Sequence, residues 1–148
     1  MIALACDHGG FPLKKAVTDY LKSAQIEYKD FGTFDGNSCD YPDFAYLVTD
    51  AIQKKEAALG ILICGTGIGM SIAANKARGI RAAVCADVFS AEMARAHNDA
   101  NVLCLGARVL DSSRAIEILK AFLETKNAEG GRHAARRTKV EKYEEQGS

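Results

Sequence analysis

Residues 59–76 read Leu59-Gly-Ile-Leu-Ile-Cys64-Gly-Thr-Gly-Ile-Gly69-Met-Ser-Ile-Ala-Ala-Asn-Lys76. The stretch passes from an apolar strand pattern, through one cysteine and three alternating glycines, into a helix pattern. Glycine lets the backbone turn tightly, and the N–H groups at the start of a helix favour negative charge. A thiol at that junction is expected to be stabilised as the thiolate, the reactive form of cysteine. Cys64 is therefore a candidate base or nucleophile.

The rest of the chain alternates short apolar runs with helix-like segments. Apolar runs without clean alternation indicate buried strands, here at residues 2–6, 26–31, 59–64, 81–86 and 102–105. A period of 3.6 residues predicts helices over residues 13–23, 44–55, 71–77, 90–97 and 112–125. This alternation predicts an α/β fold with a five-stranded parallel sheet that is covered by helices on both faces.

Length and composition limit the classes of protein that this chain can represent. A chain of 148 residues with 48% apolar residues suits one domain that spans residues 1–148. The 19 basic and 19 acidic side chains cancel, which argues against a nucleic-acid binder. Five cysteines without CxxC or zinc spacing indicate a reducing compartment, and no apolar run is long enough for a membrane. We therefore expect a cytoplasmic protein, with polar residues 141–148 frayed.

Polar residues follow several of the predicted strands. Asp7 and His8 follow the first strand, Cys64 ends the third, Asp87 follows the fourth and Arg108 follows the fifth. The carboxyl ends of parallel strands share one edge of the sheet, where ligands of such folds bind. We therefore expect these residues to gather at one edge. The segment His97-Asn98-Asp99 ends a helix instead, so the pattern does not fix its position relative to that edge.

Six segments carry a resemblance to a known family: CDHGG at 6–10, DYPDFA at 40–45, CGTGIGMSIAANK at 64–76, GIRAAVC at 79–85, HNDANVL at 97–103 and GGRH at 130–133. In this order the chain resembles the RpiB/LacAB sugar-phosphate isomerases, typified by ribose-5-phosphate isomerase B. The resemblance implies a Rossmann-like three-layer sandwich. It also implies isomerisation of aldose and ketose phosphates without a metal or nucleotide cofactor, by a homodimer, or a tetramer, with shared active sites.

The resemblance also implies catalytic roles. The usual reaction converts ribose 5-phosphate into ribulose 5-phosphate, a step of the pentose phosphate pathway, through a cis-enediolate. Cys64 is similar to the base that acts at C2, because the alternative glutamate position of the family is occupied here by Met70, which cannot accept a proton. His97 is similar to the ring-opening acid. Thr66 is similar to a residue that assists at the sugar oxygens, although capping of the loop is an equally good interpretation.

Binding roles divide between the two ends of the substrate. The backbone N–H groups of the loop are predicted to hold the enediolate oxygen, and they belong to Gly65, Gly67, Ile68 and Gly69. Contacts to the sugar are implied for Asp7, His8, Tyr41 and Asn98. Contacts to the phosphate are implied for His8, Arg108, Arg132 and Arg136, because guanidinium groups match phosphate oxygens. By similarity, the arginines and the His97 segment reach the Cys64 pocket of the partner subunit, on which the basic tail of about residues 126–148 packs.

Several residues near these motifs receive no role. Arg137 is expected to lie on a solvated charged face, as basic runs usually do. Cys39 lies in a predicted loop and has no assigned function. The remaining cysteines, which lack an adjacent glycine loop, are expected to be core residues: Cys6, Cys85 and Cys104.

Four alternatives remain to be weighed. A hexose 6-phosphate, such as allose 6-phosphate or galactose 6-phosphate, could replace the pentose phosphate, because one extra carbon changes the pocket little. A nicotinamide-binding domain would use Asp87, but the glycine spacing does not match. A metal hydrolase built on Asp7, His8, His97 and His133 lacks paired ligand spacing. A sugar-phosphate-binding module without catalysis would not require Cys64 or His97.

Overall fold

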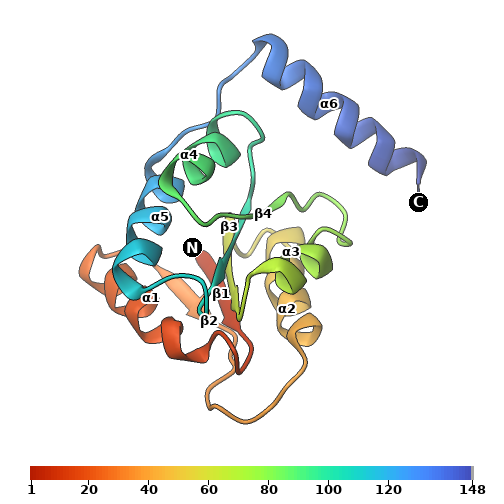
Figure 1. Cartoon of the computed structure of the whole chain (residues 1–148). Helices are drawn as coiled ribbons and strands as arrows, with labels where there is room; N and C mark the ends of the chain where they lie inside the picture. Colours follow the sequence, from red (N-terminus) through yellow and green to blue (C-terminus); the bar gives the residue numbers. More distant parts are fainter. Residues whose placement is uncertain (148) are drawn as a thin grey trace.

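The computed structural model describes residues 1–147 and has a sheet between two layers of helices (Figure 1). The strands are β1 (Ile2–Cys6), β2 (Tyr28–Asp30), β3 (Leu59–Cys64), β4 (Ala82–Val84) and β5 (Val102–Gly106). The helices are α1 (Phe11–Ser23), α2 (Tyr41–Gln53), α3 (Ile68–Ala74), α4 (Val88–Ala96), α5 (Ser112–Glu124) and α6 (Gly131–Gln146). The five strands pair in parallel in the order β2-β1-β3-β5-β4, which confirms the predicted sheet.

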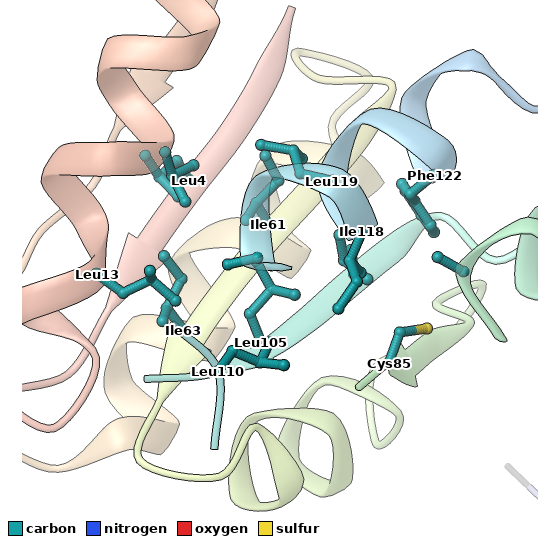
Figure 2. Packing of buried hydrophobic residues seen from close by; sticks show 14 of the residues in the cluster. Leu4, Leu13, Ile61, Ile63, Cys85, Leu105, Leu110, Ile118, Leu119 and Phe122 are labelled. Carbon is teal, nitrogen blue, oxygen red and sulfur yellow. The ribbon is translucent and has the colours of Figure 1, made fainter. Parts of the chain in front are cut away.

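The two faces of the sheet carry separate cores. Successive side chains of a strand point to opposite faces, so Leu4 faces α1 and α5 while Ala5 faces α2 and α3. Figure 2 shows the first core, in which Ile61 and Leu105 lie beneath Ile118 of α5. These three side chains are fully buried, and burial of each contributes about 1.5–3 kcal/mol. The result is the three-layer sandwich that the family resemblance implied.

Helices α1 and α2 begin earlier than the periodicity predicted. Helix α1 begins at Phe11 and α2 at Tyr41, whereas the predicted starts were residues 13 and 44. Each helix has a proline in its first turn, Pro12 in α1 and Pro42 in α2. Proline is tolerated there because the N–H that it lacks would have no partner within the helix. Each proline therefore lies in the first turn of its helix and does not precede the helix.

The two edge strands are shorter than predicted. β2 and β4 each have three residues, against predicted runs of six at 26–31 and 81–86. Each pairs with a single neighbour, and each pairing covers three residues of the strand. Just beyond these strands, the N–H of Phe31 still donates to the Leu4 carbonyl at 2.8 Å and the N–H of Cys85 to the Cys104 carbonyl at 3.2 Å, but the regular strand pairing has ended. An apolar run thus predicts a strand better than it predicts the length of an edge strand.

The chain turns directly from β3 into α3. Helix α3 begins at Ile68, three residues before the predicted start at residue 71, so Ser71 lies inside it. The residue before it, Gly67, has φ of +81°, a conformation that glycine adopts readily. This left-handed residue redirects the chain within one step. The loop between Cys64 and the helix therefore consists only of residues 65–67.

Helix α6 stands apart from the sandwich (Figure 1). The prediction of frayed residues 141–148 is wrong as far as Gln146, because α6 continues to that residue; Ser148 lies outside the described residues. None of the residues of α6 is buried, and Val140 and Tyr143 are 62% and 79% exposed. An isolated helix of this length is marginal in water, so its stability depends on contacts outside its own turns. No helix in the described part of the chain has the length and apolar character needed to cross a membrane.

Candidate active site

The thiol of Cys64 lies at the carboxyl end of β3, under the glycine loop. Its Sγ accepts a hydrogen bond from the N–H of Gly67 at 3.1 Å, and the residue is 5% exposed. A side-chain carbon at Gly67 would lie 3.2 Å from the backbone carbonyl carbon of Leu105, so the loop packs tightly against the end of β5. A donor aimed at sulfur favours negative charge on the sulfur. The geometry suits a thiol that gives up and regains a proton.

Residues from β1 and β5 flank this loop. Asp7 is buried, and its Oδ1 accepts the N–H of Gly10 at 2.9 Å, which holds the turn after β1. On the other side, the Arg108 N–H donates to the Gly65 carbonyl at 2.9 Å. The guanidinium of Arg108 lies over Gly65, where an added side-chain carbon would be 3.1 Å from Nη1. The loop thus has a carboxylate on one side and a cation on the other.

Helix α2 contributes the third side of the site. The Tyr41 ring lies against Gly69, where an added side-chain carbon would be 2.8 Å from Cζ of the ring. A larger residue at position 69 would have to displace this ring. His8 follows Asp7 and is held through Nδ1, which accepts the Cys39 N–H at 3.2 Å. This edge brings together the following residues of the predicted site: Asp7, His8, Tyr41, Cys64, Gly65, Thr66, Gly67, Ile68, Gly69 and Arg108.

Two of the loop N–H groups already have partners inside the chain. The Gly67 N–H donates to the Cys64 thiol, and the Ile68 N–H donates to the Thr66 hydroxyl at 3.3 Å. The sequence predicts that these N–H groups face a substrate oxygen, but in the structure they bond within the chain. The physical reason is that a tight glycine loop satisfies its own donors where an acceptor lies within reach. For Thr66, the loop-capping interpretation is present in the structure, and its role at the sugar stays a prediction.

A second cluster lies where α6 passes the end of α4. The imidazole rings of His97 and His133 stack, with centroids 3.8 Å apart and planes 6° from parallel. Partial desolvation lowers the pKa of His133, and the nearby His97 and three arginines of α6 lower it further. A cavity of about 760 Å³ lies between α6 and this turn, and it is lined in part by His97, Asn98, His133, Arg136 and Arg137.

Arg137 ties the two helices together. Its Nη1 donates to the His97 carbonyl at 2.9 Å, and its Nη2 donates to the Ala128 carbonyl at 2.9 Å. The expectation of a solvated charged face is therefore wrong for this residue. A helical spacing of four residues puts Arg137 on the same face of α6 as His133, and that spacing was the signal that could have identified it.

The two clusters lie at opposite edges of the sheet. His97 ends α4 and precedes β5, and the nearby Asn101 carbonyl accepts the N–H of Gly60 at the start of β3. Cys64 is the last residue of β3, a strand whose six residues span about 17 Å. A catalytic group must come within about 3 Å of the atom that it serves. Within one chain, therefore, the structure does not bring His97 to Cys64.

The predicted phosphate arginines are divided in the same way. Arg108 lies beside the Cys64 loop of its own chain, whereas Arg132 and Arg136 lie on α6 with the His97 cluster. The expectation that all the arginines reach the pocket of a partner is therefore wrong for Arg108. The cause is the register of the sheet, which pairs Gly106 with Cys64 and so carries Arg108 to the loop.

Three other thiols are buried in the cores. Burial raises the pKa of Cys6 to about 12 and that of Cys85 to about 11, and it raises the pKa of Cys104 well above its usual value. These thiols are protonated near neutral pH and lie within the two cores. The prediction that they are core residues is confirmed.

The structure gives Asp87 a capping role. Its carboxylate accepts the N–H of Ser90 at 2.7 Å and thereby caps α4, and this bond lowers the pKa of Asp87. The residue that a nicotinamide-binding domain would use for a ribose is therefore a helix cap.

The histidines and acids of the metal-site alternative are also separated. Asp7 and His8 lie at the carboxyl edge, whereas His97 and His133 lie at the amino edge. Among residues 1–147, no three His, Cys, Asp or Glu side chains are grouped so as to hold a metal ion.

Comparisons with known proteins point to one family. A model described as ribose/galactose isomerase matches residues 2–140 of the chain. Ribose-5-phosphate isomerase B of Escherichia coli is 47% identical over 135 residues, which cover 91% of this chain and 90% of that protein. The solved structure of Clostridium thermocellum ribose-5-phosphate isomerase B matches with a TM-score of 0.96, at 48% identity over 99% of each chain. The Mycoplasma genitalium ribose-5-phosphate isomerase B, solved with bound ribulose 5-phosphate, matches at 44% identity with a TM-score of 0.93 over 98% of this chain and 96% of that one.

Proposed function

Because the chain belongs to the ribose/galactose isomerase family, we propose that it interconverts ribose 5-phosphate and ribulose 5-phosphate. The observation that carries this function is the Cys64 thiol, which is held under the glycine loop by the Gly67 N–H. An aldose–ketose isomerase must open the sugar ring, move a proton from C2 to C1 and stabilise the enediolate in between. Each of these steps has a candidate group in this chain.

Cys64 is the proposed proton carrier. It takes the proton from C2, and the resulting cis-enediolate receives a proton at C1 from the same sulfur. Met70 occupies the position at which some members of the family carry a glutamate base. It is fully buried and has no group that accepts a proton. A positioned base of this kind contributes roughly 10²–10⁴-fold to the rate. No covalent bond between sulfur and sugar is needed.

The loop and its neighbours provide the contacts to the substrate. Backbone N–H groups at Gly65 and Gly69 are proposed to stabilise the enediolate oxygen, assisted by the Thr66 hydroxyl. Contacts to the sugar are assigned to Asp7, His8, Tyr41 and Asn98, and contacts to the phosphate to His8, Arg108, Arg132 and Arg136. These assignments follow the family motifs that the chain shares.

We further propose a homodimer in which two copies complete each site. His97, as ring-opening acid, together with Asn98, Arg132 and Arg136, then serves the Cys64 of the partner. The separation of the two clusters within one chain supports this arrangement, because only a second copy can bring them together. A tetramer would be a pair of such dimers.

The surface of the chain supports the same assembly. Side chains next to the glycine loop and on α4 expose apolar area, with Ile68 at 55%, Ile72 at 57% and Phe89 at 69%. On α6, Val140 and Tyr143 are also exposed. Exposed apolar groups of this size favour burial against a partner. The segment of about residues 126–148, which includes α6, is proposed to pack on the partner subunit.

We assign the protein to the cytoplasm. Its five cysteines are free, and Cys39 is partly exposed. Free thiols persist in a reducing compartment.

Initial rates with pentose and hexose phosphates test the proposed function. The purified chain should convert ribose 5-phosphate into a ketose, with lower kcat/KM for allose 6-phosphate and galactose 6-phosphate. A higher kcat/KM for one of the hexose phosphates would assign the chain to that substrate instead. Binding of ribose 5-phosphate without any ketose would contradict the isomerase and favour a binding module.

A further inference from the structure

A distant loop holds the imidazole of His8. The N–H of Cys39, 31 residues further along the chain, donates to Nδ1 of His8 at 3.2 Å. The Cys39 Sγ lies 3.9 Å from the same nitrogen. His8 itself is half-buried at the carboxyl end of β1, next to the turn that faces the glycine loop.

This contact selects one form of the imidazole. A backbone N–H can only donate, so Nδ1 must accept, and the single proton of a neutral ring then lies on Nε2. The arrangement therefore favours the tautomer in which Nε2 carries the proton and acts as a donor.

The loop that supplies Cys39 is fixed at both ends. At its start, the Thr33 carbonyl accepts from the Lys14 ammonium, which is buried and paired with Asp30 at 2.9 Å. At its end, Tyr41 begins α2 and lies over Gly69 in the candidate site. A segment anchored on both sides can hold a hydrogen bond to His8 before any substrate arrives.

We propose that the backbone of Cys39 sets His8 as a neutral Nε2–H donor to a substrate oxygen, which makes Cys39 a positioning residue. This rests on the proposed function, because the acceptor is an oxygen of the sugar phosphate. In this form Nε2 has no lone pair to receive a proton. His8 therefore binds the substrate and does not compete with Cys64 as a base.

The form of the ring is measured without reference to turnover. Long-range proton–nitrogen NMR correlations of the ¹⁵N-labelled full-length protein report which imidazole nitrogen carries the proton, and the His8→Gln spectrum identifies the His8 signals. We expect the Nε2–H pattern at neutral pH, with a coupling across the hydrogen bond between the Cys39 amide nitrogen and Nδ1. An Nδ1–H pattern or an imidazolium at neutral pH would overturn the proposal.

Variants at position 39 separate the backbone from the thiol. Cys39→Ala keeps the N–H and should keep the Nε2–H pattern, whereas Cys39→Pro removes the N–H and should give a mixture of both forms. Loss of the pattern in Cys39→Ala would contradict the role of the backbone. If the proline variant does not fold, the coupling in the wild-type protein still decides the question.

Two variants at position 8 test the donor to the substrate. The side-chain amide of His8→Gln places an N–H near the position of Nε2, whereas His8→Asn reaches only the position of Nδ1. We expect KM for ribose 5-phosphate to rise about tenfold more in His8→Asn than in His8→Gln, because a hydrogen bond to a substrate oxygen is lost. Equal KM values would overturn the donor role. Absence of isomerase activity in the wild type, with the Nε2–H pattern intact, would instead contradict only the proposed function.

Discussion

The glycine loop after β3 and the junction of α4 with α6 carry the two halves of the predicted site, and they are built differently. The loop is held by residues at the ends of β1 and β5 and by Tyr41 of α2, and its thiol is 5% exposed. The junction is held by the stacked rings of His97 and His133, by the hydrogen bonds of Arg137 and by the N–H of Ala128, which donates to the Ala96 carbonyl at 2.8 Å; helix α6 itself has no buried residue. The first region can hold a reactive atom in place by itself, whereas the side chains of the second region need another surface to pack against.

This difference explains why neither region is a complete active site. A base must be rigid relative to the carbon that it deprotonates, and a tight loop on a central strand provides that rigidity. His97 at the end of α4 and the arginines of the exposed helix α6, for which we propose roles as ring-opening acid and phosphate ligands, can be supplied by another chain. We therefore expect changes in the loop to abolish turnover. The groups of the second region, in contrast, can come from another chain.

The largest expected effect comes from removing the thiol of the loop. Cys64→Ala should lower kcat for ribose 5-phosphate by roughly 10³-fold or more, because the proton carrier is lost, with KM little changed. Initial rates over a range of substrate concentrations measure both constants. Cys85→Ala, which removes a buried thiol from the other core, is the matched control and should keep kcat. Full turnover by Cys64→Ala would contradict the assignment.

Mixing two inactive variants tests whether the regions act across the dimer. Cys64→Ala and His97→Asn should each be nearly inactive, but refolded together in equal amounts they should recover about a quarter of wild-type sites, because half the dimers are mixed and each has one intact site. Activity of the mixture measures this recovery.

The control for this experiment uses two residues of the same loop region. Cys64→Ala mixed with Arg108→Ala should not regain full sites, because both groups come from one chain. No recovery in the first mixture, under conditions where the subunits exchange, would place both catalytic groups in the same chain.

A smaller effect is expected at the junction itself. Arg137→Ala removes the hydrogen bonds from α6 to the His97 carbonyl at the end of α4 and to the Ala128 carbonyl, and it should lower kcat/KM about tenfold, since two neutral acceptors lose a charged donor. Circular dichroism should show an unchanged sandwich, because α6 contributes no buried residue. Arg137→Lys keeps the charge but not the forked geometry, and it should recover only part of the activity. Wild-type kcat/KM in Arg137→Ala would show that α6 is held by other contacts.

The smallest effect concerns the buried thiols beneath the loop region. The pKa of Cys6 is raised from 9.0 to about 12, so the folded state keeps a proton that the unfolded state loses above pH 9. Its contribution to stability is complete below pH 9 and is lost as the pH rises toward 12, at about 1.4 kcal/mol for each pH unit. Urea unfolding between pH 8 and 11 should show this decline. Cys6→Ala and Cys85→Ala should each reduce the slope, and an unchanged slope in both variants would contradict the cause.

The sequence was informative where local chemistry and strand pattern agreed. Residues 59–76 predicted a strand, a glycine turn and a helix, and β3, Gly67 and α3 follow in that order. The rule that strand ends share an edge correctly gathered Asp7 and Arg108 around the loop. Helix starts were less accurate, because Pro12 and Pro42 fit inside a first turn as well as before it.

The second region depended on contacts that no local pattern specifies. The basic composition of the tail predicted a solvated Arg137. Its hydrogen bonds to two carbonyls form because α6 passes close to the end of α4. The stack of His97 on His133 joins residues 36 positions apart, and the contact between His8 and Cys39 joins residues 31 apart. Neither pair lies within a single helix or strand.

By itself, the sequence determined the class of fold and the identity of the reactive loop, because apolar periodicity and glycine geometry act between near neighbours. Only the tertiary structure decided that Cys64 and His97 lie at opposite edges of the sheet. The physical reason is that a parallel sheet separates the two ends of every strand by its own length, here about 17 Å along β3. The motif order in the chain is the same whether the two groups meet within one copy or between two.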